Sequence, residues 1–165
     1  MTKFLHAANP TNLTITQIIT PTYSKLGTAA FDTIIIGNGH LLPPTSVIDD
    51  DSFGAYQPAT YGIDFWESLE GMQITVDTPI AVSNTNNFGE TYVVASGGVG
   101  ATGMTERGSI AISQRDSNPE KLQLDNDNGL FAGFTNVFSV GDRLSSVTGI
   151  INYVFRAKNC WLPKL

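Results

Sequence analysis

Apolar residues in this chain come in short runs, and most runs end at glycine, proline or asparagine. The run Met72–Val76 alternates apolar with polar side chains, as a strand with one buried face does. No segment keeps apolar residues at a 3.6-residue period over the length of a substantial helix. The pattern therefore predicts an all-β fold of about eight short strands joined by turns.

The expected strands span Asn12–Thr20, Ala30–Ile36, Met72–Asp77, Ile80–Ser83, Glu90–Ala95, Ser109–Ser113, Lys121–Asp125, Ser146–Phe155 and Cys160–Leu162. Residues 41–62 form a long loop, which we expect to be packed down or functional. The 165 residues suggest one domain over 1–165. We predict a five-stranded Greek-key barrel of the OB type, with extra N-terminal strands and one short helical turn; a β-sandwich is the alternative.

The helical turn is expected in the stretch DFWESLEG. Asp64 followed three residues later by Glu67 matches a capping box, and Gly71 ends the turn. Glu67 and Glu70 lie on one face, where two carboxylates act as acid and base if they line a cleft. We favour the structural interpretation, in which Glu67 closes the capping box. The apolar side chains between the acids then anchor the turn against the barrel: Phe65, Trp66 and Leu69.

The net charge of −6 disfavours binding to phosphate backbones, although a local basic patch remains compatible with it. The single cysteine, Cys160, excludes an intrachain disulfide and is expected to be a partly buried apolar residue. His6 and His40 share no catalytic motif, and His40 is expected to be exposed after its Gly-Asn-Gly turn. No apolar run reaches the ~18 residues of a membrane span. The first ten residues, MTKFLHAANP, have one lysine and no long apolar run, so they are not expected to be a signal peptide.

Two further stretches resemble ligand loops only superficially. GGVGATG, residues 97–103, lacks the Lys-Ser/Thr ending and the following helix of a phosphate-binding loop, and is expected to be a mobile hairpin loop. Asp125 begins DNDNG, but the sixth and twelfth positions of a calcium loop would be Leu130 and Asn136, so the EF-hand pattern fails. An Asp- and Asn-rich turn is preferred. A weak calcium site at Asp125 and Asp127, helped by Asp49, Asp50 and Asp51, is the alternative; no other cofactor is expected.

Six blocks occur together in this chain: IGNGHLLPPTSVIDDDSF, GIDFWESLEGM, TNNFGE, RGSIAIS, DSNPEKLQLD and VGDRLSSVTGIINYVF. In order and spacing they resemble a segment of large secreted bacterial nucleases of the endonuclease/exonuclease/phosphatase class, from about Thr14 to Leu162. ESLEGM and D-x-NPE-(K/R)-(L/I) are the most specific pieces. The chain departs from the pattern after Phe155, where Arg156-Ala157-Lys158 replaces the usual glycine.

The resemblance implies an OB-fold accessory module that precedes a catalytic domain in a larger, extracellular protein. Catalytic residues would lie outside this chain, so it is not expected to be an enzyme. The expected partner is the neighbouring catalytic domain of the same protein, with no membrane contact.

Two hypotheses follow for the module itself. In the first, it binds single-stranded nucleic acid weakly, with bases stacked on aromatic rings in a basic groove. The candidate side chains are Arg107, Arg115, Lys121, Arg143, Arg156, Lys158, Tyr92, Tyr153 and Phe155. In the second, it is a structural spacer or protein-interaction domain that orients the catalytic domain, as its low charge density and small polar residues suggest.

Overall fold

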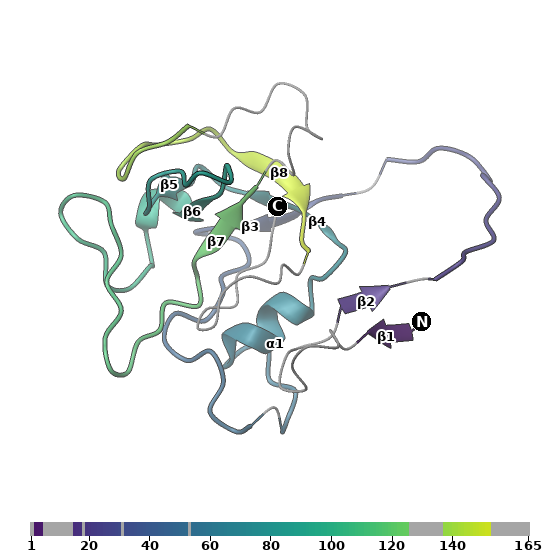
Figure 1. Ribbon diagram of the computed structural model, residues 1–165, viewed down its shortest axis with the longest axis horizontal. Coiled ribbons are helices and arrows are strands. Elements are labelled where there is room, and N and C mark those ends of the chain that lie inside the picture. Colours follow the sequence, from purple (N-terminus) through teal and green to yellow (C-terminus); the bar gives the residue numbers. More distant parts are fainter. Residues whose placement is uncertain are drawn as a thin grey trace. The chain divides into compact units, whose positions relative to one another are not determined.

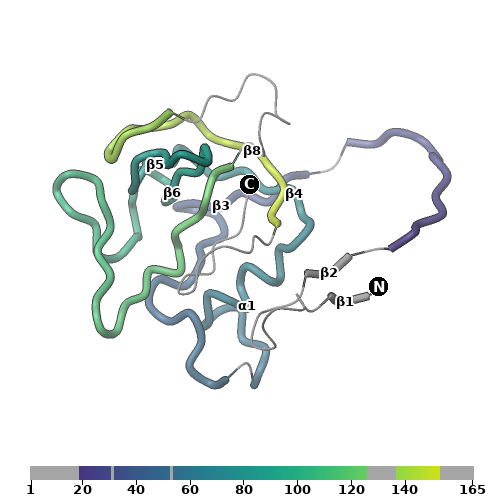
Figure 2. The backbone as a smooth tube through the Cα atoms, viewed as in Figure 1, coloured from purple at the N-terminus to yellow at the C-terminus, as the bar shows by residue number. Residues whose placement is uncertain are grey.

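The computed structural model describes residues 2–4, 15–17, 19–30, 32–52, 54–125 and 137–152. It divides into two compact units, Met1–Asp32 and Thr33–Leu165. In the first unit, β1 (Thr2–Phe4) pairs antiparallel with β2 (Ile15–Gln17), which lies inside the first expected strand. Residues 19–30 follow as an exposed segment without regular structure (Figure 2). The expectation of one domain over 1–165 stays a prediction.

The second unit contains two three-stranded sheets (Figure 1). The first sheet has the order β3-β4-β8, with bounds Ile34–Ile36, Gln73–Val76 and Val147–Ile150. In it β3 is parallel to β4, and β8 is antiparallel to β4. The second sheet is antiparallel, has the order β5-β6-β7, and has bounds Ile80–Ala81, Thr91–Val94 and Leu122–Leu124. With the short helix α1 (Gly62–Glu67) and the 3-10 turn η1 (Ser96–Gly98), the prediction of an all-β fold is confirmed.

β4 and β5 form one nearly continuous segment, residues 73–81, that contributes to both sheets. The segment bends where Thr78 adopts a φ of +33° and Pro79, which lacks a backbone donor, interrupts the ladder. The two sheets do not close into a barrel within the part of the chain that the structure describes. No helix in that part is long and apolar enough to cross a membrane.

Ser109–Ser113 is not a strand, contrary to the sequence-based prediction. Its residues make only isolated bridges, Met104 with Ile110 and Ser113 with Asp116. These bridges fold the 104–116 segment back on itself, so the alternating apolar residues have no neighbouring strand to pair with. The expected strand at Cys160–Leu162 lies outside the described residues.

The main core lies between the two sheets and α1. Its members are buried side chains from all three: Ile36, Phe65, Trp66, Leu69, Ile74, Val76, Val93, Leu122, Leu124 and Ile151. A smaller cluster of Ile80, Val82 and Val94 packs with Tyr92, Ala101, Met104 and Ile110. The predicted anchoring of the turn by Phe65, Trp66 and Leu69 is therefore confirmed.

The prediction of a capping box at Asp64 is wrong. The helix begins at Gly62, its N-cap is Tyr61, and no side chain caps it. The N–H groups of Gly62 and Ile63 instead donate to the carbonyl oxygens of Val47 and Ile48, at 2.9 and 3.1 Å. These remote carbonyls satisfy the donors that a capping side chain would otherwise take, so the helix starts two residues before Asp64.

Asp64 has another role. It lies in the first helical turn, where a negative charge is favourable, and its Oδ2 accepts the Gln57 N–H at 2.6 Å. The loop that precedes α1 is further fixed by the Ser117 N–H, which donates to Ser46 O at 2.9 Å. The expectation that the long loop is packed against the body is confirmed by these bonds.

Trp66 holds α1 to the segment that leads into β7. Its indole Nε1–H donates to Pro119 O at 2.8 Å, and its ring meets the Phe65 ring edge-on with centroids 4.9 Å apart. Gly62 also faces Pro119, so closely that a side chain at position 62 would collide with the proline ring. A helix of six residues is not stable alone, so these contacts determine where it forms.

We predict that Trp66→Ala lowers the free energy of unfolding by about 3–5 kcal/mol, because it empties a core site. Trp66→Phe keeps most of the apolar volume but leaves Pro119 O without its donor, at a cost of about 1–3 kcal/mol. Glu67→Gln, on the outer side of the same helix, should have the smallest effect of the three. Chemical denaturation of the three variants tests this order; a Glu67→Gln variant less stable than Trp66→Ala would contradict it.

Candidate functional site

The segment Asp116–Glu120 makes a tight polar turn before β7. Asn118 is fully buried and has a φ of +50°, which asparagine tolerates better than most residues. Its Nδ2 donates to Thr102 O at 3.2 Å and to Asp116 Oδ1 at 3.1 Å. The turn therefore holds the Glu120 backbone beside Thr102.

The Glu120 side chain is 6% exposed, although it carries a carboxyl group. Its Oε1 accepts two hydrogen bonds from Thr102, from the backbone N–H at 2.9 Å and from the hydroxyl at 3.1 Å. Its Oε2 is buried and has no hydrogen-bond partner among the described residues. Buried polar atoms without a partner are rare in folded proteins, so this carboxyl group is the most unusual polar feature of the segment.

Glu120 lines a cavity of about 50 Å³. The other lining residues come from three separate segments: Leu42, Pro43 and Thr45; Val94 and Ala95; and Val99, Gly100 and Ala101. Apart from Thr45 and Glu120, the lining residues have apolar side chains or, at Gly100, no side chain. Leu42 and Val99 are 48% and 58% exposed, so the cavity has an open, apolar mouth.

Burial raises the pKa of the Glu120 carboxyl above its ordinary value of 4.5, and the negative charge of Asp116 adds to the rise. The hydrogen bonds from Thr102 act in the opposite direction. The remaining lining residues are uncharged, so no positive side chain of the cavity wall compensates the carboxylate.

The glycine-rich stretch 97–103 forms one wall of this cavity. The Gly97 N–H donates to Thr78 O at 2.8 Å, and Gly103 O accepts the Ala111 N–H at 2.9 Å. The stretch begins as the 3-10 turn η1. The expectation of a mobile hairpin loop is therefore corrected to a turn that is hydrogen-bonded to two neighbouring segments.

A second polar cluster joins this turn to the bend between β4 and β5. The Ser96 hydroxyl donates to Asp77 Oδ2 at 3.1 Å and accepts the Asn38 N–H at 2.7 Å. The Ser146 hydroxyl lies 3.4 Å from Asp77 Oδ1. These groups satisfy one another, and their effect is to fix the start of η1.

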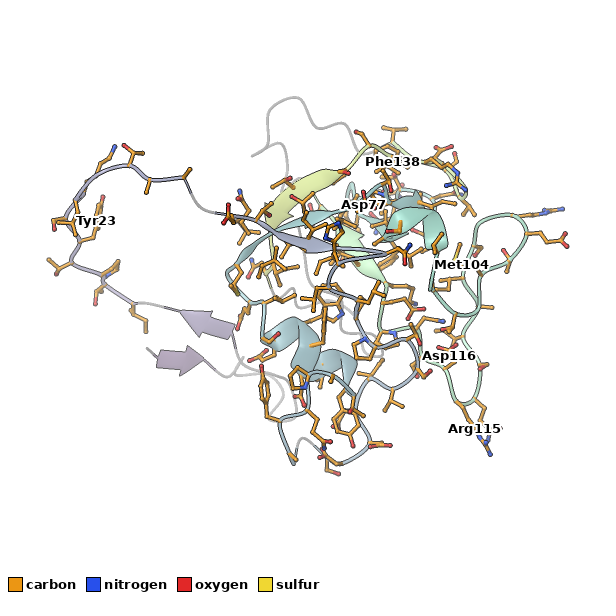
Figure 3. The ribbon with its side chains drawn as sticks, turned by 180° about the vertical axis from the view of Figure 1, so that it is seen from behind. Tyr23, Asp77, Met104, Arg115, Asp116 and Phe138 are labelled. Atoms are coloured by element: carbon orange, nitrogen blue, oxygen red, sulfur yellow. The ribbon has the colours of Figure 1, made fainter. Side chains whose placement is uncertain are left out.

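The residues predicted to bind nucleic acid are not gathered at one place among the described residues. Figure 3 shows Arg115 at the far end of the loop that leaves the sheets after Met104. Arg107 and Arg143 are exposed and closer together, because Gly108 packs against Gly141. Lys121 is half-buried at the start of β7.

Tyr92 is half-buried against the smaller hydrophobic cluster, so it does not offer an exposed stacking face. The other predicted contacts lie outside the described residues: Tyr153, Phe155, Arg156 and Lys158. The nucleic-acid site as a whole stays a prediction.

The calcium hypothesis also stays a prediction, since Asp127 lies outside the described residues while Asp125 is buried. Asp51 accepts the Gly54 and Ala55 N–H groups, both at 2.8 Å. A hydrogen bond with Asp50 is the main cause that raises the pKa of Tyr61 to about 12. Within the described ranges, no three His, Cys, Asp or Glu side chains are grouped so as to hold a metal ion.

Of the other residues singled out in the sequence, His40 is exposed, as expected. His6 and Cys160 lie outside the described residues.

These observations define an all-β protein with a small cavity that a buried glutamate helps to line. The chain belongs to the family described as Domain of unknown function (DUF8508), which it matches over residues 35–157. No curated protein and no solved structure matches it.

Glu120 was missed as a site residue by the sequence analysis, although it lies in the NPE block that characterises the resemblance. The signal that could have found it was a glutamate two residues before β7, a strand whose three residues are all buried. An acid at the entrance of a buried strand is uncommon unless it has a partner or a function.

We predict that replacing Glu120 by Gln makes stability less dependent on pH. The Glu120 carboxyl group binds a proton more tightly in the folded wild type than in the unfolded chain. The free energy of unfolding of the wild type therefore falls as pH rises from about 4.5 through the raised pKa of Glu120. Gln does not titrate, so the melting temperature of the variant relative to wild type should rise across this window. Asp116 is the charged neighbour acting on this titration.

Glu106→Gln is the matched control, because it removes an exposed carboxyl group from a loop. Thermal melts from pH 4 to pH 8 of both variants and the wild type provide the comparison. Equal pH profiles for Glu120→Gln and Glu106→Gln would show that burial of Glu120 does not affect its titration.

A second prediction concerns the cavity wall. Gly103 has a φ of +64° and its added side chain would collide with Ala111 O, whereas Gly100 has a φ of +86° with open space around it. Gly100→Ala should therefore cost only backbone strain, about 1–2 kcal/mol. Gly103→Ala should cost a further ~1–3 kcal/mol from overpacking. Urea denaturation measures the difference; equal losses would contradict the packed wall.

Proposed function

We propose that this chain is a noncatalytic accessory module of a secreted nuclease of the endonuclease/exonuclease/phosphatase class. In this proposal it makes contact with the neighbouring catalytic domain and orients it, and does not itself hold the nucleic acid. Its parent and its extracellular location are proposed from the resemblance of its sequence blocks. The acidic charge of the second unit is the main reason to favour contact with a protein over contact with nucleic acid.

In residues 33–125 and 137–152, thirteen Asp and Glu residues stand against four Arg and Lys residues. Nucleic acid binding depends on neutralising phosphates with basic side chains, so an excess of acids opposes it. The four basic residues do not form one continuous basic surface: Arg107 and Arg115 lie at different points of the loop after Met104, Arg143 precedes β8, and Lys121 is half-buried before β7. Tyr92 is packed against apolar side chains. The arrangement supports the spacer or protein-interaction hypothesis over the nucleic-acid hypothesis.

An OB-type barrel is part of the same proposal. Its support is the bent segment of β4 and β5, whose first half pairs in one sheet and second half in the other. A strand shared by two sheets is how a small Greek-key barrel turns its corner. The parallel pairing of β3 with β4 adds a strand at the edge of this arrangement.

We predict that the protein shows no saturable binding to a fluorescein-labelled single-stranded oligonucleotide, even at high micromolar protein and low salt, where electrostatic binding is strongest. Fluorescence anisotropy measures this. The same preparation should not degrade DNA when Mg²⁺ or Ca²⁺ is added.

Saturable binding that is lost in an Arg107→Ala/Arg143→Ala double variant would support the nucleic-acid hypothesis and contradict ours. Arg115→Ala, at the far end of the same loop as Arg107, is the control for loss of positive charge away from Arg107 and Arg143. For the parent protein, carbodiimide cross-linking should join acids of this unit to lysines of the catalytic domain; a complete absence of such links would contradict the docking role.

A further inference from the structure

We propose that the outer edge of β8 is the surface through which two copies of this chain associate. In this dimer, β8 of one copy pairs antiparallel with β8 of the other about a two-fold axis at Gly149. The two three-stranded sheets then form one continuous sheet with the order β3-β4-β8-β8-β4-β3. This inference is independent of the proposed function, because it rests on the geometry of β8 and on no property of a parent protein.

The first argument is that β8 has an open edge. It is the last strand of its sheet, and no other strand of the described residues pairs with its outer side (Figure 1). The other outer strands of the second unit are at least partly covered. The Leu41 N–H donates to Ile35 O in β3, the Ala81 N–H of β5 donates to Asp142 O, and the residues of β7 are all buried.

The second argument is the direction of the backbone groups, which two hydrogen bonds determine. The Ile151 N–H, just after β8, donates to Met72 O at 3.0 Å, so the backbone of residue 151 faces β4. The Asp77 N–H, just after β4, donates to Ile36 O at 2.9 Å. Odd-numbered residues of β4 therefore face β3, and even-numbered residues face β8, since the backbone groups of successive residues alternate between the two sides of a strand.

The same alternation along β8 directs Val147 and Gly149 toward β4, opposite Val76 and Ile74. The N–H and C=O groups of Thr148 and Ile150 then point away from the sheet. The two outward-facing residues of β8 thus present two donors and two acceptors at the open edge.

The third argument is that this edge is complementary to itself. When two β8 strands run antiparallel with Gly149 opposite Gly149, Thr148 of each copy lies opposite Ile150 of the other. Each of these pairs exchanges both of its N–H···O=C bonds, so every outward group of the two residues obtains a partner. A shift of one residue would place outward-facing groups opposite groups that are already bonded to β4.

The side chains fit the same pairing. Thr148 is exposed and Ile150 is 42% exposed, and in the dimer they become cross-strand neighbours. Pairs of β-branched residues stabilise antiparallel strands. At the axis itself, where opposite Cα atoms of such a pair approach to about 4.5 Å, Gly149 places no side chain.

The distribution of charge favours a second copy as the occupant. The second unit has thirteen Asp and Glu residues against four Arg and Lys residues, so two copies repel each other over most of their surface. Residues 144–152 contain no charged side chain, and two copies therefore approach at this segment with the least repulsion. Open strand edges in monomeric proteins commonly carry a lysine, another charge or a proline that prevents such pairing, and β8 has none of these.

The first test is sedimentation equilibrium of the full chain at protein concentrations from about 5 to about 500 µM. Because β8 has four residues, the interface is small, and we expect a reversible dimer with a Kd on the order of 10–100 µM. Ile150→Lys should raise this Kd at least about tenfold, since it brings a charge into the strand pairing. Ile112→Lys is the matched control: it makes the same change at a side chain that is 60% exposed on the 104–116 loop, and it should leave the Kd unchanged.

The second test is amide hydrogen exchange of the wild type, measured by NMR at the two ends of the same concentration range. Exchange at Thr148 and Ile150 should slow at least about threefold at the high concentration, because only the dimer protects these N–H groups. Exchange at Val147 and Gly149 should not depend on concentration, because their N–H groups are bonded to β4 in both states. This comparison needs no variant, so it also decides the question if Ile150→Lys does not fold.

A chain that is monomeric over the whole range would overturn the proposal. So would a dimer that Ile150→Lys and Ile112→Lys weaken equally, or one in which exchange at Thr148 and Ile150 does not change with concentration. Protection of these two amides only when the chain is joined to a neighbouring domain would also overturn pairing between copies, and would assign the β8 edge to a strand of that domain.

Discussion

The hydrogen bond from the Trp66 indole to Pro119 O is the contact on which the arrangement of the second unit depends. It joins a six-residue helix, too short to be stable alone, to the chain that enters β7. The indole ring is buried in the main core, so water does not reach this hydrogen bond. If the bond breaks, its donor and acceptor are left without partners, which costs free energy. Pro119 directly precedes Glu120, and the same contact therefore fixes the backbone from which the buried carboxyl group projects.

The cavity is formed by three parts of the chain that are distant in the sequence: residues 42–45, residues 94–101 and Glu120. The 42–45 segment is held through the loop whose carbonyls, at Val47 and Ile48, receive the first N–H groups of α1. The glycine-rich wall is held by Ser96, Asp77 and the Gly97 N–H bond to Thr78. Glu120 completes the site from the third segment. A buried carboxyl group without a compensating cation reduces stability at neutral pH, and such unfavourable groups are concentrated at functional sites.

The excess of acidic over basic residues in the second unit acts through long-range electrostatics. It disfavours polyanions such as nucleic acid and favours partners with positive charge. Membership of the DUF8508 family adds no activity to the proposed function.

Local patterns in the sequence determined the secondary structure and much of the core. Alternation predicted β4 at Met72–Asp77, because one face of this strand is buried. The turn before Glu90–Ala95 predicted the returning strand β6. The same reasoning placed Phe65, Trp66 and Leu69 in the core. Only the tertiary structure decided the rest. Asp64 is not the cap because remote carbonyl oxygens accept the first N–H groups of the helix. Ser109–Ser113 is not a strand because it makes only isolated bridges to its own flanking residues. Glu120 became a candidate site only when Thr102 and the apolar walls closed around it, since burial and hydrogen-bond satisfaction depend on residues that are far apart in the chain.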